Sequence, residues 1–114
     1  MKDYEIKYRI QRANELSREL MLHDEHGALT KSDSELSADA LASYSAAILA
    51  SKAAQDLDDR NRRIVGYHAD DQAHDFRTRE IHGIGPTDCE FTSRALEWYA
   101  RELATKLEAA LVDA

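Results

Sequence analysis

Most of the side chains that could bind or activate a ligand lie in one stretch of the chain, DDRNRRIVGYHADDQAHD. The guanidinium groups of Arg60, Arg62 and Arg63 could hold a phosphate or a carboxylate through paired hydrogen bonds. Together with Tyr67 and His68, they could bind an anionic, nucleotide-like small ligand at an oligomer interface. The neighbouring aspartates allow a second interpretation, in which the arginines form salt bridges on a solvated helix face.

The arginine and histidine spacing in this stretch resembles the catalytic motif of HEPN-type ribonucleases. In that family a histidine follows an arginine after four to six residues. Here four residues separate Arg63 from His68, and five separate Arg62 from His68. The resemblance covers residues 60 to 68. It implies a helical bundle that forms a dimer of two copies. Arg62 or Arg63 would then act with His68 as the catalytic pair on RNA.

Histidines and carboxylates also recur at helical spacing, which raises the question of metal binding. His23 and His26 are three residues apart, and two further His/Asp pairs lie between residues 68 and 74. Neither the HExxH motif nor the paired ExxH motifs of a di-iron bundle occur. We therefore predict no metal and no other cofactor. Cys89 has no neighbouring histidine in the sequence, and we interpret it as a structural residue.

Length and charge limit the class of protein. The chain has 114 residues, so we expect a single helical domain over 1–114. Its formal net charge of −7 disfavours binding to nucleic acid and suits a partner with a basic surface. Its single cysteine excludes an intrachain disulfide. The first residues lack an apolar signal region, and no uncharged run is long enough to cross a bilayer. We predict a cytoplasmic protein that does not contact a membrane.

The elements that would position these side chains are all helical, because apolar residues recur at three- and four-residue steps and no β-alternation is found. The first helix is predicted from about Tyr4 to Leu22, capped by Asp3. Ser32 and Glu35 match a capping box at the start of a second helix. Residues 40 to 51 carry no charge and are rich in Ala and Ser, which predicts a buried central helix.

The second half of the chain contains a segment that disfavours helix and, later, a clear signal for the start of a new helix. Ile64, Val65 and Gly66 disfavour helix mildly, so we expect a break or kink at 64–68. The alternative is one continuous helix over 35–81. The sequence HGIGPTDCE then predicts a stop, and Thr87 and Glu90 form a capping box for a last helix over 88–111.

Four aromatic residues lie away from the predicted apolar stripes of their helices. They are Tyr4 and Tyr8 on the first helix, and Phe91 and Trp98 on the last. Aromatic residues off the stripe either fill the space between helices or anchor an interface. We therefore predict that all four belong to an interface and that the chain forms a homo-oligomer.

These observations predict an all-α fold, a small bundle of three to four helices around the Ala/Ser-rich helix. The predicted function is that of a non-enzymatic interaction protein, an accessory or regulatory factor of a bacterial or phage type that binds a partner protein. The alternatives are an anionic-ligand binder and a HEPN-like ribonuclease.

Overall fold

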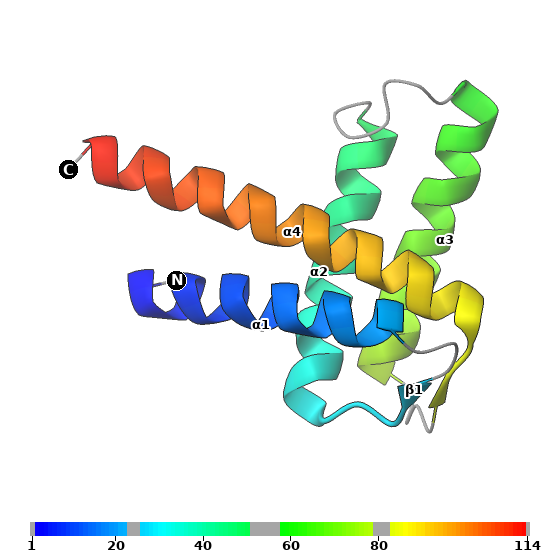
Figure 1. The fold of residues 1–114 in the computed structure, drawn as a ribbon. Helices are drawn as coiled ribbons and strands as arrows, with labels where there is room; N and C mark the ends of the chain where they lie inside the picture. The colour runs from blue at the N-terminus through cyan, green and yellow to red at the C-terminus, as the bar shows by residue number, and fades with distance from the viewer. Residues whose placement is uncertain (1, 23–25, 51–57, 79–82, 114) are drawn as a thin grey trace.

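In a computed structural model, the chain folds into a small all-α bundle, as predicted (Figure 1). The structure describes residues 2–22, 26–50, 58–78 and 83–113. The elements of this part, in chain order, are α1 (Asp3–Leu22), β1 (His26–Gly27), α2 (Lys31–Leu49), α3 (Asp59–Thr78), β2 (Gly83–Ile84) and α4 (Pro86–Asp113).

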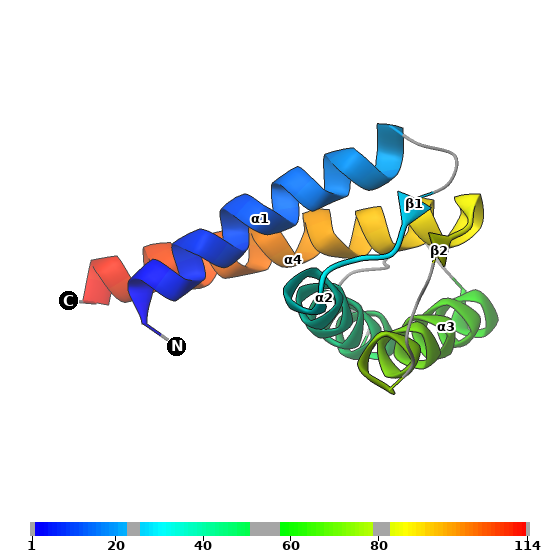
Figure 2. The same ribbon diagram turned by 90° about the horizontal axis from the view of Figure 1, so that it is seen from below.

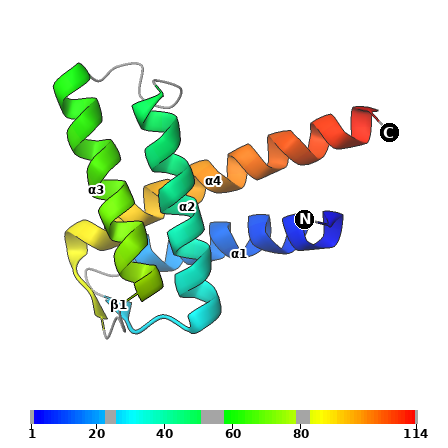
Figure 3. The same cartoon turned by 180° about the vertical axis from the view of Figure 1, so that it is seen from behind.

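The helices form two antiparallel pairs that cross each other. α1 lies along α4, and α2 lies along α3 (Figures 1 and 3). Figure 2 shows the α2/α3 pair nearly end-on, against one side of the α1/α4 pair. The first turns of α1 and the last turns of α4 run past α2 and α3 as a two-helix arm. Side chains on this arm therefore have few neighbours from the rest of the bundle.

α2 is the central helix, as its composition predicted, because it packs against α3 and α4 and also touches α1. Its Leu36, Leu41 and Ile48 are buried, and alanines and serines between them allow close packing. The burial does not coincide with 40–51, since the residues from Leu36 to Ala38 are all buried whereas Ala46 is exposed. Residue 51 lies outside the described part of the chain.

Two helix starts differ from the predicted capping boxes. Thr30 is the N-cap of α2, and its side chain accepts a hydrogen bond from the Asp33 backbone N–H at 3.1 Å. The cap therefore lies two residues before the predicted Ser32. α4 begins at Pro86, since proline is tolerated in the first helical turn, and the Cys89 N–H already donates to the Gly85 carbonyl at 2.9 Å.

The predicted break at 64–68 is wrong, and so is the alternative of one helix over 35–81. α2 ends at Leu49, whereas α3 runs unbroken from Asp59 to Thr78. Asp58 caps α3, because its carboxylate accepts a hydrogen bond from the Asn61 N–H at 2.8 Å. Residues 51–57 and 79–81, which the continuous helix would have included, lie outside the described residues.

Gly66 serves helix packing, which explains why a residue that disfavours helix lies within α3. A Cβ atom at this position would lie 2.7 Å from Cγ and Cδ2 of Leu49. The Ser45 hydroxyl donates a hydrogen bond to the Gly66 carbonyl at 2.7 Å. The glycine thus lets the backbones of α2 and α3 approach closely.

The strand pair β1–β2 joins the two connecting segments beside the ends of the helices. It is antiparallel and only two residues long, with His26 opposite Ile84 and Gly27 opposite Gly83. Ile84 is buried, and its carbonyl lies 3.4 Å from the buried Cys89 thiol. Cys89 therefore belongs to the packed interior.

Candidate functional site

The arginines and aromatic residues predicted to hold an anionic ligand lie along α3 but do not face the same way. Arg60, Arg63 and Tyr67 are exposed at three- and four-residue steps, so they share one face of the helix. Arg62 turns away from them and pairs with Asp59 at 2.7 Å. This predicted site is therefore split, and the cavities described below are lined by other residues.

His68, the second half of the arginine and histidine motif, faces α4. Its ring lies 4.8 Å from the Phe91 ring in an edge-on arrangement, and its Nε2 lies 3.8 Å from an Asp88 carboxylate oxygen. Arg63 is on the exposed face instead. HEPN-like activity stays a prediction, and an RNA cleavage assay that compares the chain with His68→Ala would test it.

The histidine and carboxylate pairs do not form a metal centre in the part of the chain that the structure describes. No group of three or more His, Cys, Asp or Glu side chains in these residues is arranged to hold a metal ion. His23 lies outside the described residues, so the pairing of His23 with His26 stays a prediction.

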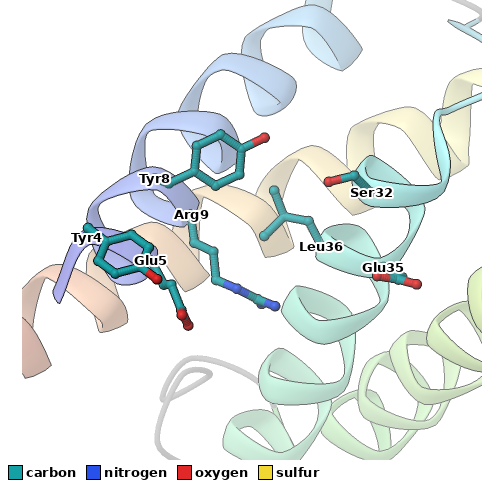
Figure 4. Close-up of a pocket in the computed structure, with 7 residues that line it drawn as sticks. All are labelled: Tyr4, Glu5, Tyr8, Arg9, Ser32, Glu35 and Leu36. Carbon is teal, nitrogen blue, oxygen red and sulfur yellow. The ribbon is translucent and has the colours of Figure 1, made fainter. Parts of the chain in front are cut away.

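A recess on the surface lies between α1 and α2 (Figure 4). It has a volume of about 420 Å³. Tyr4 and Tyr8, two of the predicted interface residues, form one wall and are 66% and 58% exposed. Leu36 of α2 lies at its inner side, and Ser32 and Glu35 form the opposite wall. We call this recess the α1/α2 groove.

Two sets of ion pairs fix the separation of the groove walls. Arg12 donates two hydrogen bonds to Asp33 across the helices, at 2.9 and 2.7 Å, in a paired geometry. Arg9 donates to Asp39 at 2.8 Å. Because α1 packs mainly on α4 and little on α2, these charged contacts provide direct links between the two walls of the groove.

The electrostatics of these pairs match their geometry. The hydrogen bonds from Arg12 hold the pKa of the Asp33 carboxyl below its usual value, against the opposing effect of burial. The hydrogen bond to Asp39 likewise raises the pKa of Arg9. Arg9, Arg12 and Asp33 are therefore charged at neutral pH.

Asp39 lies where the four helices meet. It accepts hydrogen bonds from Arg9 of α1 and from Arg77 of α3, at 2.8 and 3.1 Å. Arg9 also donates to the hydroxyl of Tyr99 of α4 at 3.3 Å. One side chain from each helix thus takes part in a single hydrogen-bonded group.

A second cavity opens beside this group, with a volume of about 490 Å³. Its polar lining consists of Asp39, Arg77, Tyr99, Ser43 and Lys106, and its apolar lining of Ile6 and Leu103. We call it the junction cavity. The cavity is therefore mainly polar, with one apolar side.

Sequence reasoning missed these residues. Arg9 and Arg77 stand far apart in the chain and far from Asp39 and Lys106, and no short motif joins them. The only available signal was that Arg9 and Arg12 recur at helical spacing on α1.

Phe91 and Trp98, the other predicted interface residues, pack within the chain. Tyr44 of α2 lies between them, with ring centroids 6.1 Å from Phe91 and 5.6 Å from Trp98. Both rings remain partly exposed. Tyr44 of the central helix therefore covers part of both aromatic rings.

Comparisons with protein-family models, with curated proteins and with solved structures found no match to this chain. Within the described ranges, no helix has the length and apolar character needed to span a bilayer. Any function must therefore be argued from the geometry of the groove and the cavity.

Proposed function

We propose that this chain is a non-enzymatic helical interaction protein, an accessory or regulatory factor that binds a partner protein in the α1/α2 groove. The observation that carries the proposal is the exposure of Tyr4 and Tyr8, 66% and 58%, beside a groove of about 420 Å³. Tyrosine offers a broad apolar ring with a polar end, and it is enriched at the centres of protein interfaces.

The charge around the groove indicates the chemistry of the partner. Glu5 and Glu35 line it, and Arg9, the one cation among the described residues that line it, is already paired with Asp39. The chain as a whole has a net charge of −7. The groove therefore favours a segment with an apolar side chain to fill it and lysines or arginines on either side, which the tyrosine rings can also attract through their faces.

The ion pairs from Arg9 and Arg12 support this role. They link α1 directly to α2, and the groove stays open beside them. A groove whose walls are already in place loses little conformational entropy on binding. A short helical or extended segment of the partner suits such a site.

The test uses defined peptides and the full chain labelled with ¹⁵N. One peptide is an amphipathic helix with leucines on one face and lysines beside them, and the other replaces each lysine with glutamate. We expect the basic peptide to shift the backbone resonances of Tyr8, Ser32 and Glu35. Tyr8→Ala should weaken binding about tenfold, the loss typical of an anchoring aromatic residue.

Tyr67→Ala is the matched control, since Tyr67 is 59% exposed but lies on α3. It should leave the affinity within about twofold. Equal losses in the two variants, or equal affinity for the two peptides, would refute the groove as the binding site. Groove resonances that move with protein concentration alone, with a doubled mass in light scattering, would show that the occupant is a second copy and not a partner.

A further inference from the structure

The junction cavity is surrounded by an excess of positive charge, although the protein as a whole is acidic. Arg77 and Lys106 line it with two positive charges, and Asp39 lines it with one negative charge. Arg9 does not line the cavity, but it adds a third positive charge beside it, because it donates hydrogen bonds to Asp39 and Tyr99. Asp39 is held by both arginines, so its carboxylate oxygens are occupied. Among the described residues Lys106 makes no ion pair. In a chain with a net charge of −7, this excess of two charges marks the cavity as a site for an anion.

The hydroxyl of Tyr99, a residue that is buried as a whole, provides a second indication. The residue is only 8% exposed, and its oxygen accepts a hydrogen bond from Arg9 at 3.3 Å. In the described part of the chain, no acceptor for the Tyr99 O–H proton is found, although the side chain lines the cavity. A hydroxyl on a largely buried side chain normally has an acceptor, and an anionic oxygen in the cavity would supply one. Ser43 offers a further hydroxyl donor.

The other side of the cavity is apolar. Ile6 of α1 and the buried Leu103 of α4 form it. An inorganic ion would leave this wall in contact with water, whereas an organic group attached to the anion would cover it. A volume of about 490 Å³ accommodates one small molecule.

We propose that the junction cavity binds a small organic phosphate monoester, whose phosphate faces Arg77, Lys106 and the Tyr99 hydroxyl while its organic group contacts Ile6 and Leu103. A phosphate monoester carries close to two negative charges at neutral pH, which matches the excess of two positive charges. Its three free oxygens match the separate donors from α2, α3 and α4. This site is distinct from the α1/α2 groove, so each can fail without the other.

The probe for the test is phenyl phosphate, titrated into the full chain and followed by calorimetry and by ¹⁵N resonances. We expect shifts at Ser43, Arg77 and Lys106. Lys106→Gln should bind about tenfold more weakly, because it removes one charge-assisted contact. Tyr99→Phe removes only the hydroxyl and should weaken binding several-fold, an effect of the size of one hydrogen bond.

Arg94→Gln is the matched control. Arg94, like Arg77, is an arginine on a helix surface with one carboxylate partner, Glu90 at 2.7 Å, but it does not line the cavity. Its removal should leave the affinity within about twofold.

Benzenesulfonate, which has a similar shape and a single negative charge, should bind about tenfold more weakly than phenyl phosphate. Equal affinities for the two compounds would overturn the match to a doubly charged ligand. Equal losses in Arg94→Gln and Lys106→Gln, or an absence of shifts at the cavity residues, would overturn the site. Inorganic phosphate that binds as tightly as phenyl phosphate would overturn the role given to the apolar wall.

Discussion

Replacement of Gly66 by alanine distinguishes two opposing physical effects in the centre of the fold. Alanine is the better helix former, and in an exposed helix the change would stabilise the protein by about 1 kcal/mol. Gly66 is instead buried within α3 against α2. The added Cβ would lie 2.7 Å from Cγ and Cδ2 of Leu49, about an ångström closer than a normal carbon–carbon contact.

The steric effect should outweigh the helix propensity. Cγ is the branching atom of Leu49 and cannot turn away as the end of a long side chain can, so either Leu49 or the helix backbone must move. Overpacking of this kind costs roughly 1–3 kcal/mol, which exceeds the gain in propensity by about 1 kcal/mol. Separation of the helices would also lengthen the hydrogen bond from Ser45 to the Gly66 carbonyl, now 2.7 Å. We expect Gly66→Ala to lower the free energy of unfolding by about 1 kcal/mol.

A double-mutant cycle with Leu49→Ala tests this explanation. Truncation of Leu49 removes both atoms that the new Cβ would meet. In that background Gly66→Ala should stabilise the protein by up to about 1 kcal/mol, so the sign of the effect reverses. Urea denaturation monitored by circular dichroism gives all four free energies. If Gly66→Ala stabilises both backgrounds equally, the two helices do not approach closely at this glycine and our account of α3 is wrong.

Three further predictions concern other contacts between the helices. Asp33→Asn should destabilise the fold by about 1–3 kcal/mol at pH 7. Because its folded pKa is lowered, mainly by Arg12, this contribution is complete above the unfolded pKa of about 3.9 and is lost as the pH falls through the folded value; chemical denaturation at pH 7 and pH 2.5 should show the effect shrinking at the lower pH. Ser17 and Ser93 each donate a hydrogen bond to the other's carbonyl, at 3.0 and 2.8 Å, so Ser17→Val should cost more than Ser17→Ala in thermal unfolding, since only valine adds volume. Trp98 packs at 5.6 Å from Tyr44, so its fluorescence should be blue-shifted relative to free tryptophan and should shift to the red in Tyr44→Ala.

The helices could be predicted because their signals are local. The apolar steps of α1 and α4 placed both helices, and the uncharged composition of α2 identified it as central. The break was misplaced because the propensity of Gly66 was read without its neighbour. Leu49 lies seventeen residues earlier in the chain, and only the packed structure shows that the glycine is required by contact with that side chain.

The candidate sites were harder to predict because their residues meet only after folding. The stretch from residue 58 to 75 attracted attention since its charges are close in sequence, yet Asp58 caps a helix and Asp59 pairs with Arg62. The groove and the junction cavity draw single residues from separate helices. Of the predicted interface residues, Tyr4 and Tyr8 do line the groove, and they were recognised because an aromatic residue off the apolar stripe is visible in the sequence.

Arg9 is the side chain that the groove and the junction group share. It lines the groove, extends toward α2 in Figure 4, and donates to both Asp39 and Tyr99. Loss of its guanidinium would leave Asp39 with Arg77 alone and remove one link between α1 and α2, so a change at Arg9 affects both sites. Tyr8 and Lys106 each line only one of these two recesses. The two sites therefore share one origin, because the four helices bring partly exposed charged side chains from separate parts of the chain into hydrogen-bonding contact.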